Sequence, residues 1–120
     1  MKKVLVVDDE AETVRMLSMA VELLGFQPVG VDSGERALEE AKRDAPDAVL
    51  LDLMMPGMDG FEVARRLRAD PATAATPIVV VSAMAEADVE DRCRAAGANA
   101  FLAKPVNLGE LLDLLKEFTQ

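Results

Sequence analysis

Acidic, hydroxyl and amino side chains each stand directly after a short apolar run of this sequence. The acidic pair Asp8 and Asp9 follows the first run, and Asp52 follows a later one. Ser82 and Lys104 follow two further runs. Carboxylates are ligands that Mg2+ prefers, a lysine ammonium pairs with anions, and a hydroxyl donates hydrogen bonds to phosphoryl oxygens. Together these residue types predict a site for a divalent cation and an anion.

The three carboxylates would repel one another if the fold brought them within a few ångströms. Such crowding destabilises a protein or raises a carboxyl pKa unless a cation balances the charge. Mg2+ accepts one or two carboxylates while it keeps several water ligands. Asp8, Asp9 and Asp52 are therefore the candidate ligands, and Lys104 is a second, mobile positive charge.

Each residue taken alone also has an ordinary structural interpretation. An aspartate after a strand is often a loop residue or a helix cap, a serine such as Ser82 caps helices, and a lysine such as Lys104 lies in solvent. Asp32, which follows the second apolar run, is assigned to a turn and given no chemistry. The site interpretation depends on joint placement, because residues with suitable chemistry end four of the five predicted strands.

Short apolar runs and longer amphipathic segments alternate along the chain. A continuous apolar run is typical of a strand buried on both faces, and apolar residues three or four apart indicate a helix. Asp59 and Glu62 have the spacing of a capping box, Glu86 is placed early in the fourth helix, and Gly25 and Gly97 mark helix ends. The predicted strands are 4–7, 27–31, 48–51, 78–81 and a weak one within 98–103, each followed by a helix.

Five strand–helix units in sequence predict an α/β fold. The expected architecture is a five-stranded parallel sheet in the order 2-1-3-4-5, doubly wound by five helices in a flavodoxin-like arrangement. Ligands bind such sheets at the carboxyl ends of the strands, where the strand order reverses. Asp8, Asp9 and Asp52 would meet there, with Ser82 and Lys104 beside them. We expect a single domain over residues 1–120.

Composition excludes several classes of function. The chain has 120 residues, a net charge of −9, and no histidine, tryptophan or tyrosine. The negative charge opposes direct binding of nucleic acid, and the scarcity of aromatic rings opposes base stacking. Without histidine there is no histidine-based catalytic triad and no imidazole zinc site. Any phosphohistidine in the chemistry of this protein must therefore belong to a partner.

A cytoplasmic location without a membrane anchor is expected. The one cysteine, Cys93, cannot form an internal disulfide, which fits a reducing compartment. No apolar run approaches the ~20 residues that a membrane span needs. The first apolar run ends at once in Asp8 and Asp9, which a signal peptide would not tolerate.

The segments around these residues resemble the response regulator receiver domains of two-component signal transduction, the CheY-like superfamily. The acidic pair lies in Val-Val-Asp-Asp-Glu, and Asp52 opens Asp-Leu-Met-Met-Pro-Gly-Met-Asp-Gly, which is similar to the family's phosphoacceptor loop. Ser82 and Ala83 resemble its hydroxyl and small residue, and Lys104 and Pro105 resemble its lysine and following proline. The similarity covers the whole chain, and the combination is highly specific.

The resemblance implies a role for each matched residue. Asp52 is the phosphoacceptor, Asp9 binds Mg2+ directly, and Asp8 binds it partly through water. The backbone carbonyl of Met54 completes the protein ligands, and Mn2+ is expected to substitute for Mg2+. The family assigns phosphoryl binding to Ser82, Ala83 and Lys104, the switch to Ser82 and Phe101, and loop shaping to Pro56, Gly60 and Pro105.

Two positions are variants of the family pattern. Ser82 stands where threonine is commoner and keeps the hydroxyl donor, and Phe101 stands where tyrosine is commoner and lacks the phenolic hydroxyl. In the family this ring turns inward as the hydroxyl moves toward the phosphoryl group, although Phe101 also has the interpretation of an ordinary core residue. The Lys104–Pro105 peptide is cis in the family, which the following proline permits.

The implied function is a phosphorylation-dependent signalling switch. The phosphoryl group would come from a sensor histidine kinase or a histidine phosphotransfer protein in a Mg2+-dependent reaction. The domain would catalyse only its own phosphorylation and dephosphorylation, and so is not an enzyme in the usual sense. A surface on the last two helices and the strand between them would change and bind an unidentified protein target. We expect no direct nucleic-acid or membrane contact, in either a stand-alone regulator or a fragment of a longer one.

Three other functions are alternatives. An aspartate-nucleophile phosphatase would carry a second aspartate two residues after the nucleophile, where this chain has Met54, and would need a cap domain. A flavin- or nucleotide-binding domain would need glycine or hydroxyl groups after the first strand, where Asp8, Asp9 and Glu10 would repel phosphate. An interaction module without phosphorylation stays open if no kinase recognises the chain.

Overall fold

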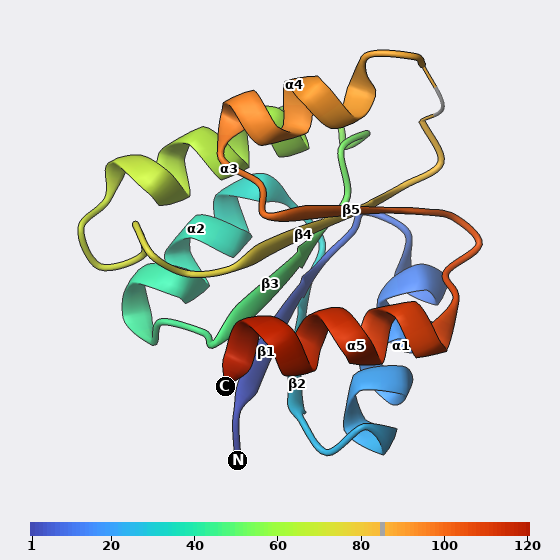
Figure 1. Ribbon diagram of the computed structural model, residues 1–120. Coiled ribbons are helices and arrows are strands. Elements are labelled where there is room, and N and C mark those ends of the chain that lie inside the picture. The colour runs from blue at the N-terminus through green and yellow to red at the C-terminus, as the bar shows by residue number, and fades with distance from the viewer. Residues whose placement is uncertain (85) are drawn as a thin grey trace.

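A parallel sheet lies between two layers of helices (Figure 1). The computed structural model describes residues 1–84 and 86–120. Its five strands lie in the order β2-β1-β3-β4-β5, and every neighbouring pair is parallel, which confirms the predicted topology. The strands are β1 Lys3–Val7, β2 Gln27–Val31, β3 Ala48–Leu51, β4 Ile78–Ser82 and β5 Ala100–Ala103, and the helices are α1 Ala11–Leu23, α2 Gly34–Arg43, α3 Gly60–Ala69, α4 Val89–Ala96 and α5 Leu108–Thr119.

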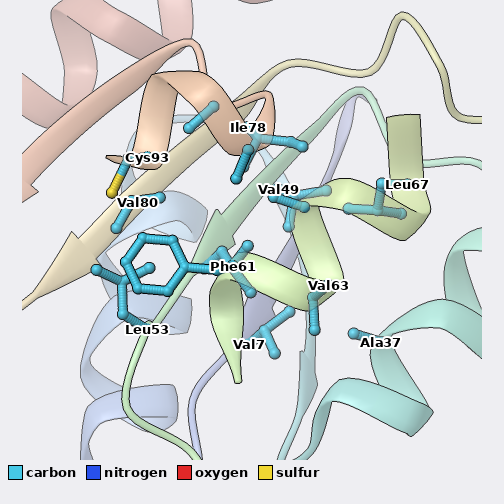
Figure 2. Close-up of a cluster of buried hydrophobic side chains, with 14 of the residues drawn as sticks. Val7, Ala37, Val49, Leu53, Phe61, Val63, Leu67, Ile78, Val80 and Cys93 are labelled. Carbon is cyan, nitrogen blue, oxygen red and sulfur yellow. The ribbon is translucent and has the colours of Figure 1, made fainter. Parts of the chain in front are cut away.

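The inner strands bury alternate residues on opposite faces of the sheet, which explains their unbroken apolar runs. In β1, Leu5 and Val7 belong to the core beneath α2, α3 and α4, whereas Val4 and Val6 belong to the core beneath α1 and α5. Figure 1 shows these two helical layers on either side of the sheet. Figure 2 shows the first core, in which the ring of Phe61 from α3 lies near β4 and α4. With both faces filled, the polar residues are left at the strand ends.

Most predicted helix ends are confirmed. Asp59 caps α3, where its Oδ1 accepts the N–H of Glu62 at 2.9 Å. Gly25 and Gly97 have φ angles of 95° and 113°, in the left-handed region that ends helices.

Within the described residues, no helix combines the length and apolar character needed to cross a bilayer.

Two details differ from the sequence prediction. The carboxylate of Glu62 pairs with Arg65 and Arg66 in the next turn of α3, so the capping box is only half formed. Helix α4 begins at Val89, and Glu86 therefore lies before it in the segment that follows β4. The arginines that compete for Glu62 are local partners on the same helix, and the first residue of a helix such as α4 is poorly specified by sequence pattern.

Strand register determines which polar residues meet at the carboxyl edge of the sheet. Val7 pairs with Leu51 across β1 and β3, and the N–H of Asp52 donates to the Val7 carbonyl at 3.0 Å. The N–H of Lys104 donates to the carbonyl of Ser82, also at 3.0 Å. Ser82 itself is the last residue of β4 rather than the first residue after it. The ends of four strands thus present their polar residues side by side.

The end of β2 stays apart from this group. Strand β2 is at one edge of the sheet, and Asp32 lies exposed in the bend that follows it. The Asp32 carboxylate lies 3.6 Å from the guanidinium of Arg36, one turn into α2. This placement agrees with the interpretation of Asp32 as a turn residue.

Candidate functional site

Asp8, Asp9 and Asp52 form a carboxylate cluster beyond β1 and β3. One carboxylate oxygen from each residue lies within 4.8 Å of the others. Asp8 and Asp52 are buried, with 2% and 5% of their surface exposed, whereas Asp9 is exposed. The fold thus brings together the three acids that the sequence singled out, in two different environments.

Lys104 supplies a positive charge to the carboxylate cluster. Its Nζ donates to Oδ2 of Asp8 at 2.9 Å and lies 3.8 Å from Oδ1 of Asp52. The other oxygen of Asp8 accepts the backbone N–H of Glu10 at 2.9 Å, so both Asp8 oxygens are held. Sequence reasoning missed this role of Glu10, because a backbone donor has no side-chain signature. The Lys104–Pro105 peptide is cis, as expected.

Burial and crowding raise the pKa of Asp52 to about 6. Loss of water around the carboxyl group has the largest effect, and the negative charges of Asp8 and Asp9 add to it. Lys104 and a backbone hydrogen bond from Met54 act in the opposite direction. Burial also lowers the pKa of Lys104, but its hydrogen bond to Asp8 and its attraction to Asp52 outweigh that effect, and the net shift is upward. Lys104 therefore stays positively charged, but its charge does not fully balance the negative charge of the carboxylates around it.

A short loop leads from Asp52 into α3. The N–H of Gly60 donates to the carbonyl of Leu53 at 3.0 Å. A Cβ at Gly60 would lie 2.2 Å from the carbonyl oxygen of Asp52, so a larger residue would displace the backbone that carries Asp52. Met54 is exposed, and Pro56 lines a cavity of about 400 Å3 between this loop and α4. Gly60 therefore determines where Asp52 sits relative to α3.

Ser82 and the residues around it form the second side of the site. Ser82 is fully buried, and its hydroxyl oxygen accepts the N–H of Met84 at 3.1 Å. That bond uses a lone pair and leaves the hydroxyl proton available to donate. Ala83 is exposed, and Phe101 is half-buried; both line a cavity of about 380 Å3 together with Lys104. The two residues of the expected switch thus lie on neighbouring strands, with one cavity beside them.

The arrangement has the chemistry of a cation site next to an anion site. Asp8, Asp9 and Asp52 offer only oxygen atoms, and their combined charge exceeds that of Lys104. A hard divalent cation would relieve the remaining repulsion. Lys104 and the proton of Ser82 can together receive an oxyanion. A buried carboxylate between these two sites is suitably placed to act as a nucleophile.

Comparison with known proteins agrees with this geometry. PleD, a response regulator of Caulobacter vibrioides, is 40% identical over 105 residues, which span 88% of this chain but only 23% of PleD. The polar-differentiation response regulator DivK of Brucella ovis is 28% identical over 98% of this chain and 95% of DivK. The solved receiver domain of the sensor histidine kinase PA1611 from Pseudomonas aeruginosa, which has a magnesium ion coordinated in its active-site cleft, is 30% identical. That comparison covers 98% of this chain and 97% of the other, with a TM-score of 0.91.

The family match extends over nearly all of the sequence. The family model described as the response regulator receiver domain matches residues 4–116, from β1 into the last helix. We conclude that this chain belongs to the response regulator receiver domain family of two-component signalling.

Proposed function

We propose that this domain is a phosphorylation-dependent switch whose acceptor is Asp52. The phosphoryl group comes from a phosphohistidine on a sensor histidine kinase or a histidine phosphotransfer protein. The observation that carries the proposal is the meeting of Asp8, Asp9 and Asp52 within 4.8 Å, with Nζ of Lys104 only 3.8 Å from Asp52. This combination pairs a candidate nucleophile with the charges that phosphoryl transfer needs.

Mg2+ is proposed to bind at the carboxylate cluster. Asp9 and Asp52 would bind it directly, Asp8 partly through water, and Met54 through its backbone carbonyl. The fit rests on the all-oxygen donor set and on the raised pKa of Asp52, to which burial contributes most and the negative charges of Asp8 and Asp9 add. Bound Mg2+ would neutralise charge on the transferring phosphoryl group, and Mn2+ would substitute because it favours the same oxygen ligands. The magnesium ion in the related PA1611 domain supports this assignment.

Asp52 acts as the nucleophile. One of its carboxylate oxygens attacks phosphorus while the bond from phosphorus to the donor's histidine nitrogen breaks, and that nitrogen keeps the electron pair. Lys104 pairs with one phosphoryl oxygen, and the hydroxyl of Ser82 donates a hydrogen bond to another. The small side chain of Ala83 leaves the approach to Asp52 open. The domain catalyses only this reaction and the later hydrolysis of its own aspartyl phosphate, in which water releases inorganic phosphate and restores the Asp52 carboxylate. Loop shaping is proposed for Pro56, Gly60 and Pro105.

Phosphorylation replaces the single negative charge of the ionised Asp52 carboxylate with a phosphoryl group that carries close to two. Movement of Ser82 toward these charges would carry the segment between β4 and α4 with it, and Phe101 would respond because it lines the cavity beside Ala83. The face of α4, β5 and α5 would then bind a protein target. Direct binding of nucleic acid is not proposed, because the net charge of the chain is −9 and would repel a phosphate backbone. Unchanged backbone NMR shifts on this face after phosphorylation would contradict the proposed switch.

We also propose that residues 1–120 act as one receiver domain in the cytoplasm, where the buried Cys93 stays reduced. The chain spans nearly all of DivK but about a quarter of PleD. A stand-alone regulator and a part of a longer protein are therefore both represented among its relatives. The same chemistry at Asp52 serves either arrangement.

Intact-mass spectrometry tests the acceptor. After incubation with acetyl phosphate and Mg2+ and an acid quench, the wild type should carry one phosphoryl group, and Asp52→Ala or added EDTA should abolish it. Asp32→Ala is the matched control, because Asp32 also follows a strand but pairs with Arg36 in solvent. If neither acetyl phosphate nor a phosphohistidine donor modified the wild type, the proposal would fail in favour of a phosphorylation-independent interaction module. An adduct that persisted in Asp52→Ala would place the acceptor elsewhere.

A further inference from the structure

Two arginines connect α3 and α4 at opposite ends of α4. Near the carboxyl end of α4, Arg68 of α3 donates to the carbonyl of Gly97 at 3.0 Å and to Oδ1 of Asn99 at 2.8 Å. Near the amino end, Arg92 of α4 reaches back to α3, and its guanidinium carbon lies 4.5 Å from the centroid of the Phe61 ring. Figure 2 shows that ring next to α4. The first connection consists of hydrogen bonds, and the second is a cation–π contact.

The Arg92 contact adjoins the loop that carries Asp52. Phe61 directly follows Gly60, the residue whose missing side chain lets α3 approach the Asp52 carbonyl. On its other side, Nη1 of Arg92 lies 3.4 Å from the carboxylate of Glu86, in the segment that joins β4 to α4. We call Phe61, Arg92 and Glu86 the Arg92 clasp. The clasp ties the start of α3, this segment and the first half of α4 together.

The amino end of α4 has the weaker attachment of the two. Asp88 at its N-cap makes no side-chain capping bond. The side chains of Arg92 and Glu86 are 48% and 62% exposed, so both their ion pair and the ring contact are weak. At the other end, backbone bonds of 3.0 and 2.9 Å from Gly97 and Ala98 back to the helix add to those of Arg68. A displacement of α4 would therefore begin at its amino end.

We propose that Arg92 is a positioning residue that holds the start of α4 in the arrangement adopted without a phosphoryl group. This inference rests on the proposed function. Glu86 stands in sequence between Ser82 and α4, so in this proposal movement of Ser82 toward a phosphoryl group on Asp52 is opposed by the contacts of the clasp. A contact made in only one of two arrangements shifts their balance by its own free energy and no more. For an exposed cation–π contact that corresponds to about two- to five-fold in the equilibrium constant.

Amide hydrogen exchange, read by NMR on the unphosphorylated full chain, tests the clasp directly. Arg92→Met keeps an apolar stem without the charge, Arg92→Lys keeps a cation near the ring, and Arg94→Met removes another exposed arginine from α4. We expect the amide of Val89, which bonds to the Glu86 carbonyl, to exchange about two- to five-fold faster in Arg92→Met. Exchange in the other two variants should match the wild type, and the Gly97 amide should be unchanged in all three.

The initial rate of phosphorylation by acetyl phosphate and Mg2+ is the second readout. Arg92→Met should react about two- to five-fold faster than the wild type, and Arg92→Lys and Arg94→Met should react at the wild-type rate. Unchanged exchange in Arg92→Met, or failure of Arg92→Lys to restore wild-type exchange, would overturn the clasp. Faster amide exchange in Arg92→Met with an unchanged rate of phosphorylation would overturn the link between the clasp and phosphorylation. If even the wild type took no phosphoryl group, the proposed function would fail, while the exchange data would still decide whether the clasp exists.

Discussion

At neutral pH the ionised carboxylate of Asp52 lowers the stability of the folded protein. The fold raises the pKa of this group from its ordinary value of 3.8 to about 6. Between these values the folded state keeps a proton that the unfolded chain has released, so stability falls as the pH rises through this range. One pKa unit corresponds to about 1.4 kcal/mol, which sets an upper limit of about 3 kcal/mol on the effect.

Asp52→Asn removes the charge and keeps the shape of the side chain. In EDTA at about pH 7.5 we expect this variant to be about 1–3 kcal/mol more stable than the wild type, because solvent at the exposed side of the cluster screens part of the repulsion. The advantage should shrink as the pH falls through about 6 and disappear near 4, where the wild-type carboxyl group is also neutral.

Urea denaturation of both proteins at a series of pH values in EDTA measures this difference. Asp32→Asn is the control and should stay within about 0.5 kcal/mol of the wild type, because Asp32 is exposed and outside the cluster. Added Mg2+ should stabilise the wild type more than Asp52→Asn, since a ligand of the folded state alone adds stability. An Asp52→Asn protein that was less stable at neutral pH, or an advantage that did not vary with pH, would refute the picture of a buried and crowded carboxylate.

Three further substitutions test other parts of the site and its supports. Asp9→Asn should slightly raise the melting temperature without Mg2+, because Asp9 adds to the charge near Asp52, and should weaken Mg2+ binding in calorimetry; a destabilised variant with normal affinity would contradict this. Gly60→Ala should cost about 1–3 kcal/mol in urea denaturation, because its Cβ would meet backbone at 2.2 Å. Gly109→Ala, whose Cβ would meet a side-chain atom at 3.2 Å, is the control and should cost little. Arg68→Met should cost about 2–4 kcal/mol by losing its bonds to the carbonyls of Gly97, at the end of α4, and of Thr76, just before β4, and an unchanged urea midpoint would show that these bonds add nothing.

The topology and the residues at the edge of the sheet could be predicted from the pattern of residue types. Apolar runs such as that of β1 are long enough for strands and too continuous for a sheet with one face in solvent, so helices must cover both faces. Each run ends at a polar residue, and parallel strands bring their carboxyl ends together. Asp8, Asp52 and Lys104 could therefore be predicted to lie near one another.

The balance of charge among these groups depends on their arrangement in three dimensions and could not be predicted. Residue type does not distinguish Asp8 from Asp9, and only the family resemblance gave them different roles, but the fold buries Asp8 between Lys104 and the Glu10 amide and leaves Asp9 exposed. The raised pKa of Asp52 likewise depends chiefly on lost solvent and only then on neighbouring charge. Electrostatic energies depend on the distance between groups and on the medium around them, and neither quantity is encoded in a run of residue types.

The attachment of α4 was also beyond the reach of the sequence. Arg92 and Phe61 belong to different helices, and each fits the pattern of its own helix without indicating the other. Helical periodicity assigns residues to a buried or an exposed face, but it does not specify how two helices cross. Which side chains meet between α3 and α4 is decided by the packing of both helices on one sheet, and hence by the whole chain at once.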